Sequence, residues 1–359
     1  MIPLSVLDLT RVAPGGTGRQ ALHDTVRAAE AADALGYRRF WVAEHHVSPN
    51  CAGSSPAVLI AHIAASTRRI RVGSGGVMLT NYAPLVIAEQ FAVLQALHGG
   101  RIDLGLGRAS GGVSVDSALD VALRRSARAH ASFPELVDEL TGFLRRDWPA
   151  DHPMRELELS PRVEAPDVYV LGTTENGARD AAERGLPFVL GYHLGRSKCR
   201  PAALTHYQET FTPGRHGGKP STMASVNVLC AATDDEAVLR ARTIAGDAVR
   251  ERHARTSPDT PLPVVRVNHL VDKELEENHV VHGGPATVLA ALEALAGTLG
   301  VDELMLNAWD AAGQERIRTL SLVAREARLV QDGSAALDRE QNAEGSNGRS
   351  RHVVGASPR

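Results

Sequence analysis

The sequence predicts an α/β protein that closes into a TIM (β/α)8 barrel. Short apolar runs alternate with longer amphipathic stretches, which is the pattern of parallel strands joined by right-handed helical crossovers. Four such units leave a doubly wound open sheet as an alternative, but eight can be placed along the chain, and eight is the number that closes a barrel. The length of 359 residues fits one large barrel with insertions.

The first half of the chain supplies four of the expected strands. Apolar residues recur every three or four positions from Leu22 to Leu35, which indicates a helix that Gly36 then ends. Pro56 stands near the first turn of the next helix, where its missing N–H is tolerated. In chain order, strands are expected over 4–9, 40–43, 70–79 and 101–107, and helices over 19–35, 55–67 and 84–97.

The second half repeats the alternation four more times. Strands are expected over 168–171, 188–192, 226–231 and 303–307, and helices over 175–185, 201–211, 234–253 and 314–330. Ala109–Ser132 is a long connection after the fourth strand and a candidate lid over the ligand face. Ser257–Pro285 is an insertion before the last unit. The polar segment 331–359 lacks apolar periodicity and is expected to be a disordered tail, which leaves 1–330 as the barrel domain.

Composition narrows the classes of function. The formal net charge of −3 gives no reason to expect a nucleic-acid partner. The three cysteines form neither a disulfide framework nor a zinc pattern, and no H-x-H or H-E-x-x-H run suggests another metal site. We find no signal peptide and no uncharged apolar run of about 18 residues, so a cytoplasmic protein without a membrane partner is expected. Phosphate-loop, dinucleotide and nucleophile-elbow motifs are missing too.

A carboxylate and two imidazoles follow the strand over 40–43. If the strand persists, alternation puts Glu44 and His46 on one side and His45 on the other. This spacing argues against a metal site built from both histidines, and it suits one histidine that enters a pocket while its neighbours brace it. Taken alone, the motif could also be a chance polar strand end.

A second candidate site lies where the strand over 168–171 meets the next helix. Gly172-Thr173-Thr174 offers backbone amides and hydroxyls at a helix N-terminus, a favourable place for phosphate. Plain N-capping by Thr174 is the alternative. Arg108, at the end of the fourth strand, could supply a guanidinium, although a surface arginine is the simpler interpretation.

The strand over 70–79 contains Gly73-Ser74-Gly75-Gly76, unusually many small residues for a strand. Glycine inside a strand marks either a bulge or the close approach of a ligand or another backbone. The residues alone leave both open.

Long motifs in the first 110 residues resemble, taken together, the bacterial luciferase-like, flavin-dependent monooxygenase family. The likeness is thinner but stays in order to about residue 330. The motifs are Trp41–His46, Ile70–Leu79, Ala83–Phe91 and Gly100–Arg108, with weaker matches at Gly172–Thr174 and Gly300–Met305.

The resemblance implies a TIM barrel that binds reduced FMN (FMNH2) at the C-terminal ends of its strands. A separate flavin reductase would supply the FMNH2, and O2 would provide one oxygen atom to a small organic substrate, with secondary metabolites as a candidate class. Family members usually pair through helices on one side of the barrel, so a homodimer is expected. Two alternatives stay open: F420-dependent hydride transfer, as in a related branch, and a flavin-binding partner protein without chemistry.

Residue by residue, His45 matches the family's active-site histidine, with a role in hydrogen bonding or proton transfer. Arg108, Thr173 and Thr174 match phosphate-binding positions, and Gly172 is grouped with them. Family members commonly have a non-proline cis peptide under the flavin ring, which here maps to Gly75–Gly76 or Gly76–Val77. The luciferase proper has a reactive cysteine where this chain has Gly107, so light emission is not expected.

Overall fold

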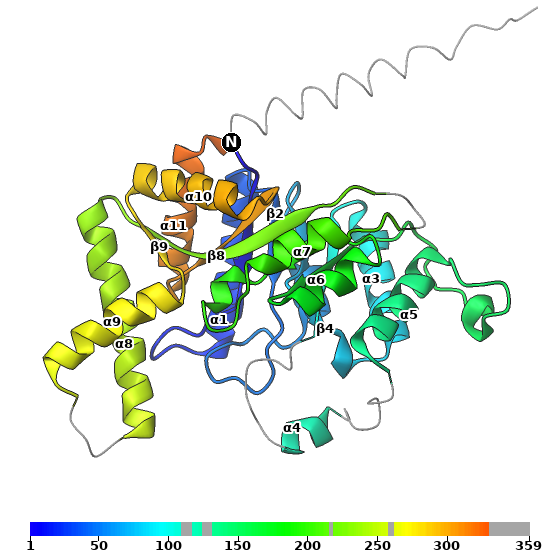
Figure 1. Cartoon of the computed structure of the whole chain (residues 1–359), viewed down its shortest axis with the longest axis horizontal. Helices are drawn as coiled ribbons and strands as arrows, with labels where there is room; N and C mark the ends of the chain where they lie inside the picture. Colours follow the sequence, from blue (N-terminus) through cyan, green and yellow to red (C-terminus); the bar gives the residue numbers. More distant parts are fainter. Residues whose placement is uncertain (109–116, 124–130, 215–217, 258–261, 330–359) are drawn as a thin grey trace, which may run out of the picture.

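Eight parallel strands close into a barrel, which confirms the TIM-barrel prediction and excludes the open sheet (Figure 1). This computed structural model describes residues 1–108, 117–123, 131–214, 218–257 and 262–329. The last barrel strand pairs with both the first and the one before it, so the ring has no open edge there. In ring order the strands are β1 (Leu4–Asp8), β2 (Arg39–Val42), β3 (Arg71–Ser74), β5 (Ile102–Gly107), β6 (Asp167–Gly172), β7 (Phe188–Leu190), β8 (Thr222–Cys230) and β10 (Glu303–Ala308).

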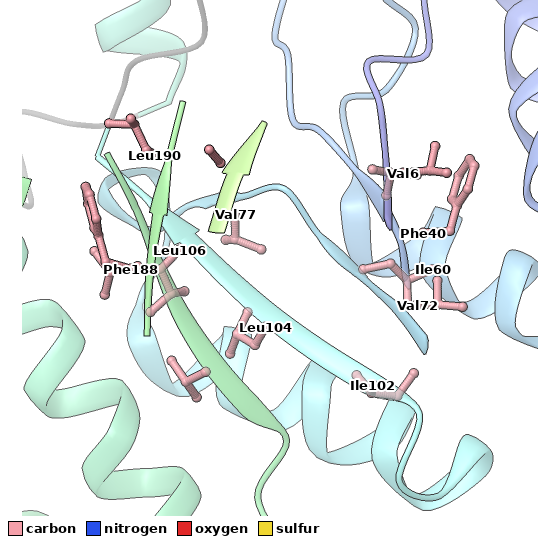
Figure 2. Close-up of a cluster of buried hydrophobic side chains, with 14 of the residues drawn as sticks. Val6, Phe40, Ile60, Val72, Val77, Ile102, Leu104, Leu106, Phe188 and Leu190 are labelled. Carbon is pink, nitrogen blue, oxygen red and sulfur yellow. The ribbon is translucent and has the colours of Figure 1, made fainter. Parts of the chain in front are cut away.

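Helices cover the outside of the barrel and bury the outward side chains of the strands. Figure 2 shows this layer, in which Val6, Phe40 and Val72 from three strands lie near Ile60 of a helix. Fully burying one such side chain stabilises the fold by about 1.5–3 kcal/mol. The helices of this layer are α1 (Gly18–Ala34), α2 (Pro56–Ser66), α3 (Pro84–His98), α5 (Phe133–Arg145), α6 (Glu175–Ala182), α7 (Ala202–Thr210), α10 (Pro285–Leu299) and α11 (Gly313–Glu326).

One indole fills the middle of the barrel. Trp41 is fully buried, packs edge-on against Tyr169 with ring centroids 5.0 Å apart, and donates its Nε1–H to Asp103 Oδ2 at 2.9 Å. Gly73 on the neighbouring strand faces the indole, and Gly105 lies on the strand after that. A Cβ on Gly73 would lie 2.7 Å from Trp41 Nε1, and one on Gly105 would overlap the carbonyl oxygen of Ser74. These glycines are therefore required by the packing of the barrel itself.

Buried ion pairs close the N-terminal end of the barrel. Arg39 reaches from β2 to Asp103 of β5 (Nη1–Oδ2 2.8 Å) and to Glu303 of β10 (Nε–Oε1 3.0 Å). Arg71 of β3 joins the same Asp103 carboxylate. Buried charges are stable only when they are paired and hydrogen-bonded, and here each one is. The network leaves the C-terminal end as the one open for a ligand.

The expected strand over 70–79 was wrong as a single strand. The backbone breaks at Gly75–Gly76, and a second short strand, β4 (Val77–Met78), pairs with β5. A Cβ on Gly76 would lie 2.8 Å from the carbonyl oxygen of Gly105, so the glycine pair marks a close approach of two backbones. This supports the close-backbone interpretation of the Gly-rich run.

Two barrel helices differ from the sequence-based assignment. The prediction left the helix after the fourth strand unplaced, and α5 occupies that position. The expected helix over 234–253 forms as α8 (Asp234–Thr256), but it packs beside α9 (Val264–Glu277), away from the main core (Figure 1). The core position between β8 and β10 belongs to α10, whose Val288 and Leu292 are buried in it.

The segments outside the eight units are only partly described. Within Ala109–Ser132 the structure contains α4 (Ser117–Ala122), and the proposed lid otherwise lies largely outside the described residues. Ser257–Pro285 contains α9 and a short strand, β9 (Val281–Gly283), which pairs with β8. The tail 331–359 lies outside the described residues. In the described part of the chain, no helix combines the length and apolarity that a membrane span needs.

We expect opposite effects from alanine at two buried or helical glycines. Gly105→Ala should destabilise the protein by about 1–3 kcal/mol, because the new methyl group overlaps backbone that cannot rotate away. Gly297→Ala, in α10 with no atom within 4 Å of its new Cβ, should stabilise it by about 0.5–1 kcal/mol. Urea unfolding followed by circular dichroism measures both. Equal effects at the two positions would contradict the packing argument.

Candidate functional site

Polar residues from four strand ends gather at the open mouth of the barrel. They follow β1, β2, β5 and β7, whose carboxyl ends all lie on this side because the strands are parallel. The residues are Arg11, His45, Arg108 and His193. Among the described residues no group of three or more His, Cys, Asp or Glu side chains is arranged to hold a metal ion.

Glu44 is a buried carboxylate that fixes the loop after β2. It accepts hydrogen bonds from the Met78 backbone N–H at 3.0 Å and the Tyr82 hydroxyl at 3.0 Å, and its Oε1 lies 2.6 Å from His46 Nε2. β2 itself ends at Val42, so strand alternation does not extend to Glu44 and His46, but their side chains are in contact. Burial and the Glu44 charge raise the pKa of Tyr82, which therefore stays a protonated donor.

The backbone of His45 is hydrogen-bonded, but its ring makes no hydrogen bond with the residues that the structure describes. Its N–H donates to the Gly53 carbonyl at 2.8 Å. Nδ1 is buried and has no hydrogen-bond partner within the described ranges. Burial lowers the pKa of His45, and the nearby Arg11 and His46 lower it further. A neutral imidazole at the mouth can both accept and donate a proton near neutral pH.

Two further residues at the mouth, His193 and Arg11, were not predicted from the sequence. His193 follows β7 in a single 3-10 turn, and its Nδ1 lies 2.6 Å from Ser225 Oγ. Burial, then Arg11 and His45, lower the pKa of His193 to about 3. Arg11 follows β1, donates from Nη1 to the Trp309 carbonyl at 3.0 Å, and stacks over the Trp309 ring with Cζ 5.3 Å from its centroid. The sequence feature that could have indicated Arg11 and His193 is a titratable side chain shortly after a strand.

The expected phosphate-binding residues Gly172, Thr173 and Thr174 lie where β6 meets α6, a place called here the phosphate corner. Thr174 stands at the N-cap position of α6, but its side chain makes no capping hydrogen bond, so plain side-chain capping does not occur. Arg108 forms an ion pair with Asp180 of the same helix. The structure thus brings Arg108 and the Thr174 segment to one helix, with Glu175 in its first turn as a competing negative charge.

Glycines shape both the phosphate corner and the ring of strands. Gly172 and Gly177 face each other closely, since a Cβ on Gly172 would lie 3.4 Å from the Gly177 Cα. The Gly75–Gly76 peptide is cis, at one of the two bonds that the resemblance indicated. A Cβ on Gly107 would meet only the Val77 carbonyl oxygen, 3.9 Å away, so space is left there. That these residues contact a flavin remains a prediction.

Comparison with known proteins gives concordant matches. The family model described as luciferase-like monooxygenase matches residues 2–303. A luciferase-like monooxygenase of Escherichia coli (strain K12) is 33% identical over 330 residues, 89% of this chain and 96% of its own. The N-acetyl-S-alkylcysteine monooxygenase of Bacillus subtilis (strain 168) is 42% identical over 217 residues, 60% of this chain and 64% of its own. The crystal structure of apo-MsnO8 superposes with a TM-score of 0.77 at 33% identity, covering 92% of this chain and 99% of that one.

The low pKa of His193 predicts a contribution to stability that is lost in acid. As the pH falls below about 6.5, the unfolded imidazole takes up a proton while the folded one stays neutral until about pH 3, so unfolding becomes easier. Through this group the free energy of unfolding of the unaltered protein should fall by up to about 1 kcal/mol between about pH 7 and about pH 5.5. The His193→Gln variant should lack this part of the fall. Urea unfolding at both pH values measures it. The exposed His23→Gln variant is the control, and an equal pH response of both variants would contradict the prediction.

Proposed function

The chain belongs to the luciferase-like monooxygenase family, and from this premise we propose that it uses FMNH2 and O2 to oxygenate a small organic molecule. The observation that carries the proposal is the unpartnered ring of His45 at the barrel mouth. Its backbone and its flanking residues are fixed by hydrogen bonds, whereas its imidazole is left for a ligand. A positioned neutral imidazole is suited to proton transfer during the oxygen chemistry.

The residues present fit a flavin mononucleotide. The N-terminus of α6, without a side-chain cap at Thr174, would hold the phosphate, and the exposed Arg108, which pairs with Asp180 of the same helix, would supply a guanidinium to it. Gly107, where a Cβ would have no described neighbour nearer than the Val77 carbonyl oxygen at 3.9 Å, leaves room for a flat ring. When bound, reduced FMN supplies the electrons that activate O2. His45 would then hold or move a proton at the reacting oxygen, and the closed N-terminal end would keep the reaction at the mouth.

Supply of the reduced flavin is assigned to a separate reductase. The sequence has no dinucleotide-binding fingerprint, so nothing in it indicates a site for a nicotinamide reductant. For the substrate, the Bacillus relative named N-acetyl-S-alkylcysteine monooxygenase suggests a thioether as the first compound to assay. Oxygen transfer to the thioether sulfur would use the same positioned imidazole.

We further propose that two copies pair through α2 and α3. These adjacent helices bury apolar residues against the barrel, yet their outer sides also expose valine and leucine. A helix that is apolar on all sides is normally covered on all sides. The exposed residues are Val58 (70%), Val86 (43%), Val93 (44%) and Leu97 (68%).

His45→Ala should bind FMN as the unaltered chain does but lose its oxygenase activity by about 100-fold or more, the usual weight of a positioned acid–base group. Product formation from an N-acetyl-S-alkylcysteine is measured with FMN, NADH, an added flavin reductase and O2. His23→Ala on the exposed side of α1 is the control. Full activity of His45→Ala, or turnover that proceeds without O2 on reduced F420, would contradict the proposal.

Leu97→Glu should convert the proposed dimer into monomers, because it would place a charge within an apolar contact. Leu239→Glu on α8 is a matched control, since Leu239 is also 68% exposed but lies outside the proposed contact. Size-exclusion chromatography with light scattering gives the mass of each. A monomeric unaltered chain, or equal loss of dimer in both variants, would refute pairing through α2 and α3.

A further inference from the structure

Arg11, His45 and His193 follow the carboxyl ends of β1, β2 and β7, and each keeps a donor or acceptor that no group in the described residues uses. Arg11 acts electrostatically on both His45 and His193, whose pKa values it lowers, so the three lie within range of one another. Of the five N–H groups of the guanidinium, one donates to the Trp309 carbonyl. The nitrogens without a partner are not enclosed by protein, because none of them is among the buried unpartnered atoms. Arg11 therefore presents free N–H groups to accessible space.

The other inward arginines form ion pairs with carboxylates, whereas Arg11 does not in the described part of the chain. Arg39 pairs with Asp103 and Glu303, and Arg316 pairs with Asp8 at 2.6 Å. Within the described part of the chain, no carboxylate lies within ion-pair distance of Arg11. A half-buried guanidinium without a counter-charge is costly, which makes the position of Arg11 unusual for a purely structural role.

The nearest carboxylates are already engaged elsewhere. Burial lowers the pKa of Arg11, and Asp8 and Asp310 are the carboxylates that oppose this shift. Asp8 is held by Arg316 and by the Thr10 backbone N–H at 2.6 Å. Asp310 forms an ion pair with Arg240. Neither carboxylate forms an ion pair with Arg11, and the other group that opposes the shift in its pKa is the thiol of Cys51, which is not a carboxylate.

We propose that Arg11 binds a carboxylate of the organic substrate, with His45 and His193 beside it. This specificity rests on the proposed oxygenase function, because it concerns the substrate of the same mouth. Arg11 and Arg108 then divide the anionic groups between them. The guanidinium after β1 takes the substrate carboxylate, and the one after β5 takes the flavin phosphate. A bidentate arginine–carboxylate contact at Arg11 would also fix how the substrate enters, since the stacked Trp309 ring limits the rotation of the guanidinium.

The test uses the full chain without flavin and two pairs of probes. Sodium acetate and sodium benzoate carry the carboxylate, and acetamide and benzamide are their neutral counterparts. Isothermal titration calorimetry at constant ionic strength, in a buffer free of carboxylates, should detect the acids but not the amides. Arg11→Gln should weaken binding of the acids at least tenfold, while Arg11→Lys should retain part of it. Arg196→Gln, at an exposed arginine paired with Glu276, should change nothing.

A second titration with FMN separates this inference from the proposed function. Arg11→Gln should bind FMN as the unaltered chain does, and Arg108→Gln should show the reverse pattern, with weaker FMN binding and unchanged binding of the acids. The inference is overturned if neither acid binds, if acids and amides bind alike, if Arg11→Gln keeps the acid affinity, or if it loses FMN affinity instead. Failure of FMN to bind the unaltered chain would reject the flavin proposal while leaving the carboxylate result to stand by itself.

Discussion

The packing of Trp41 inside the ring of strands is the constraint on which the rest of the structure depends. An eight-stranded barrel is just wide enough for side chains to fill it, so one indole determines what its neighbours can be. Gly73 faces it because a Cβ there would meet the ring, and Gly105 is glycine because a Cβ there would overlap the carbonyl oxygen of Ser74. Its Nε1–H also satisfies Asp103, which joins it to the ion pairs below. Side chains therefore fill the interior of the barrel, and a ligand can bind only at the mouth.

The packing around Trp41 also determines which positions at the barrel rim must be glycine. Gly75 would place a Cβ 3.3 Å from the Trp41 Cβ, and Gly76 would approach Gly105. Both are therefore demanded by packing before any ligand is considered. Gly107 differs, because a Cβ there would meet no atom of the described residues nearer than the Val77 carbonyl oxygen at 3.9 Å. Of the rim glycines, Gly107 is the one that most directly widens the mouth.

The sequence specified the barrel well because its signals are local. All eight barrel strands overlap the ranges expected for them, since apolar periodicity and Gly stops are read within a few residues. The run over 70–79 divides into β3 and β4, and β8 begins four residues earlier than expected. The position of α10 was not predicted, because periodicity does not tell which of two successive helices reaches the core. Ser132 and Glu135 form a capping box that could have revealed α5. Of the site, the segment around His45 was recognised by its motif, whereas Arg11 and His193 are single residues that only barrel closure brings together.

The two ends of the barrel differ in how completely their polar groups are satisfied. At the N-terminal end Arg39, Asp103 and Glu303 use one another, and nothing further is required there. At the mouth, Thr10 Oγ1, His45 Nδ1 and Trp309 Nε1 are buried without partners among the described residues. Unmet polar atoms cost free energy in the isolated fold, and they are tolerated where a bound molecule can meet them. The contrast between the two ends of the barrel therefore favours the mouth as the end that receives a ligand, while other unpartnered buried atoms, such as Trp148 Nε1 and His206 Nε2, lie elsewhere in the described fold.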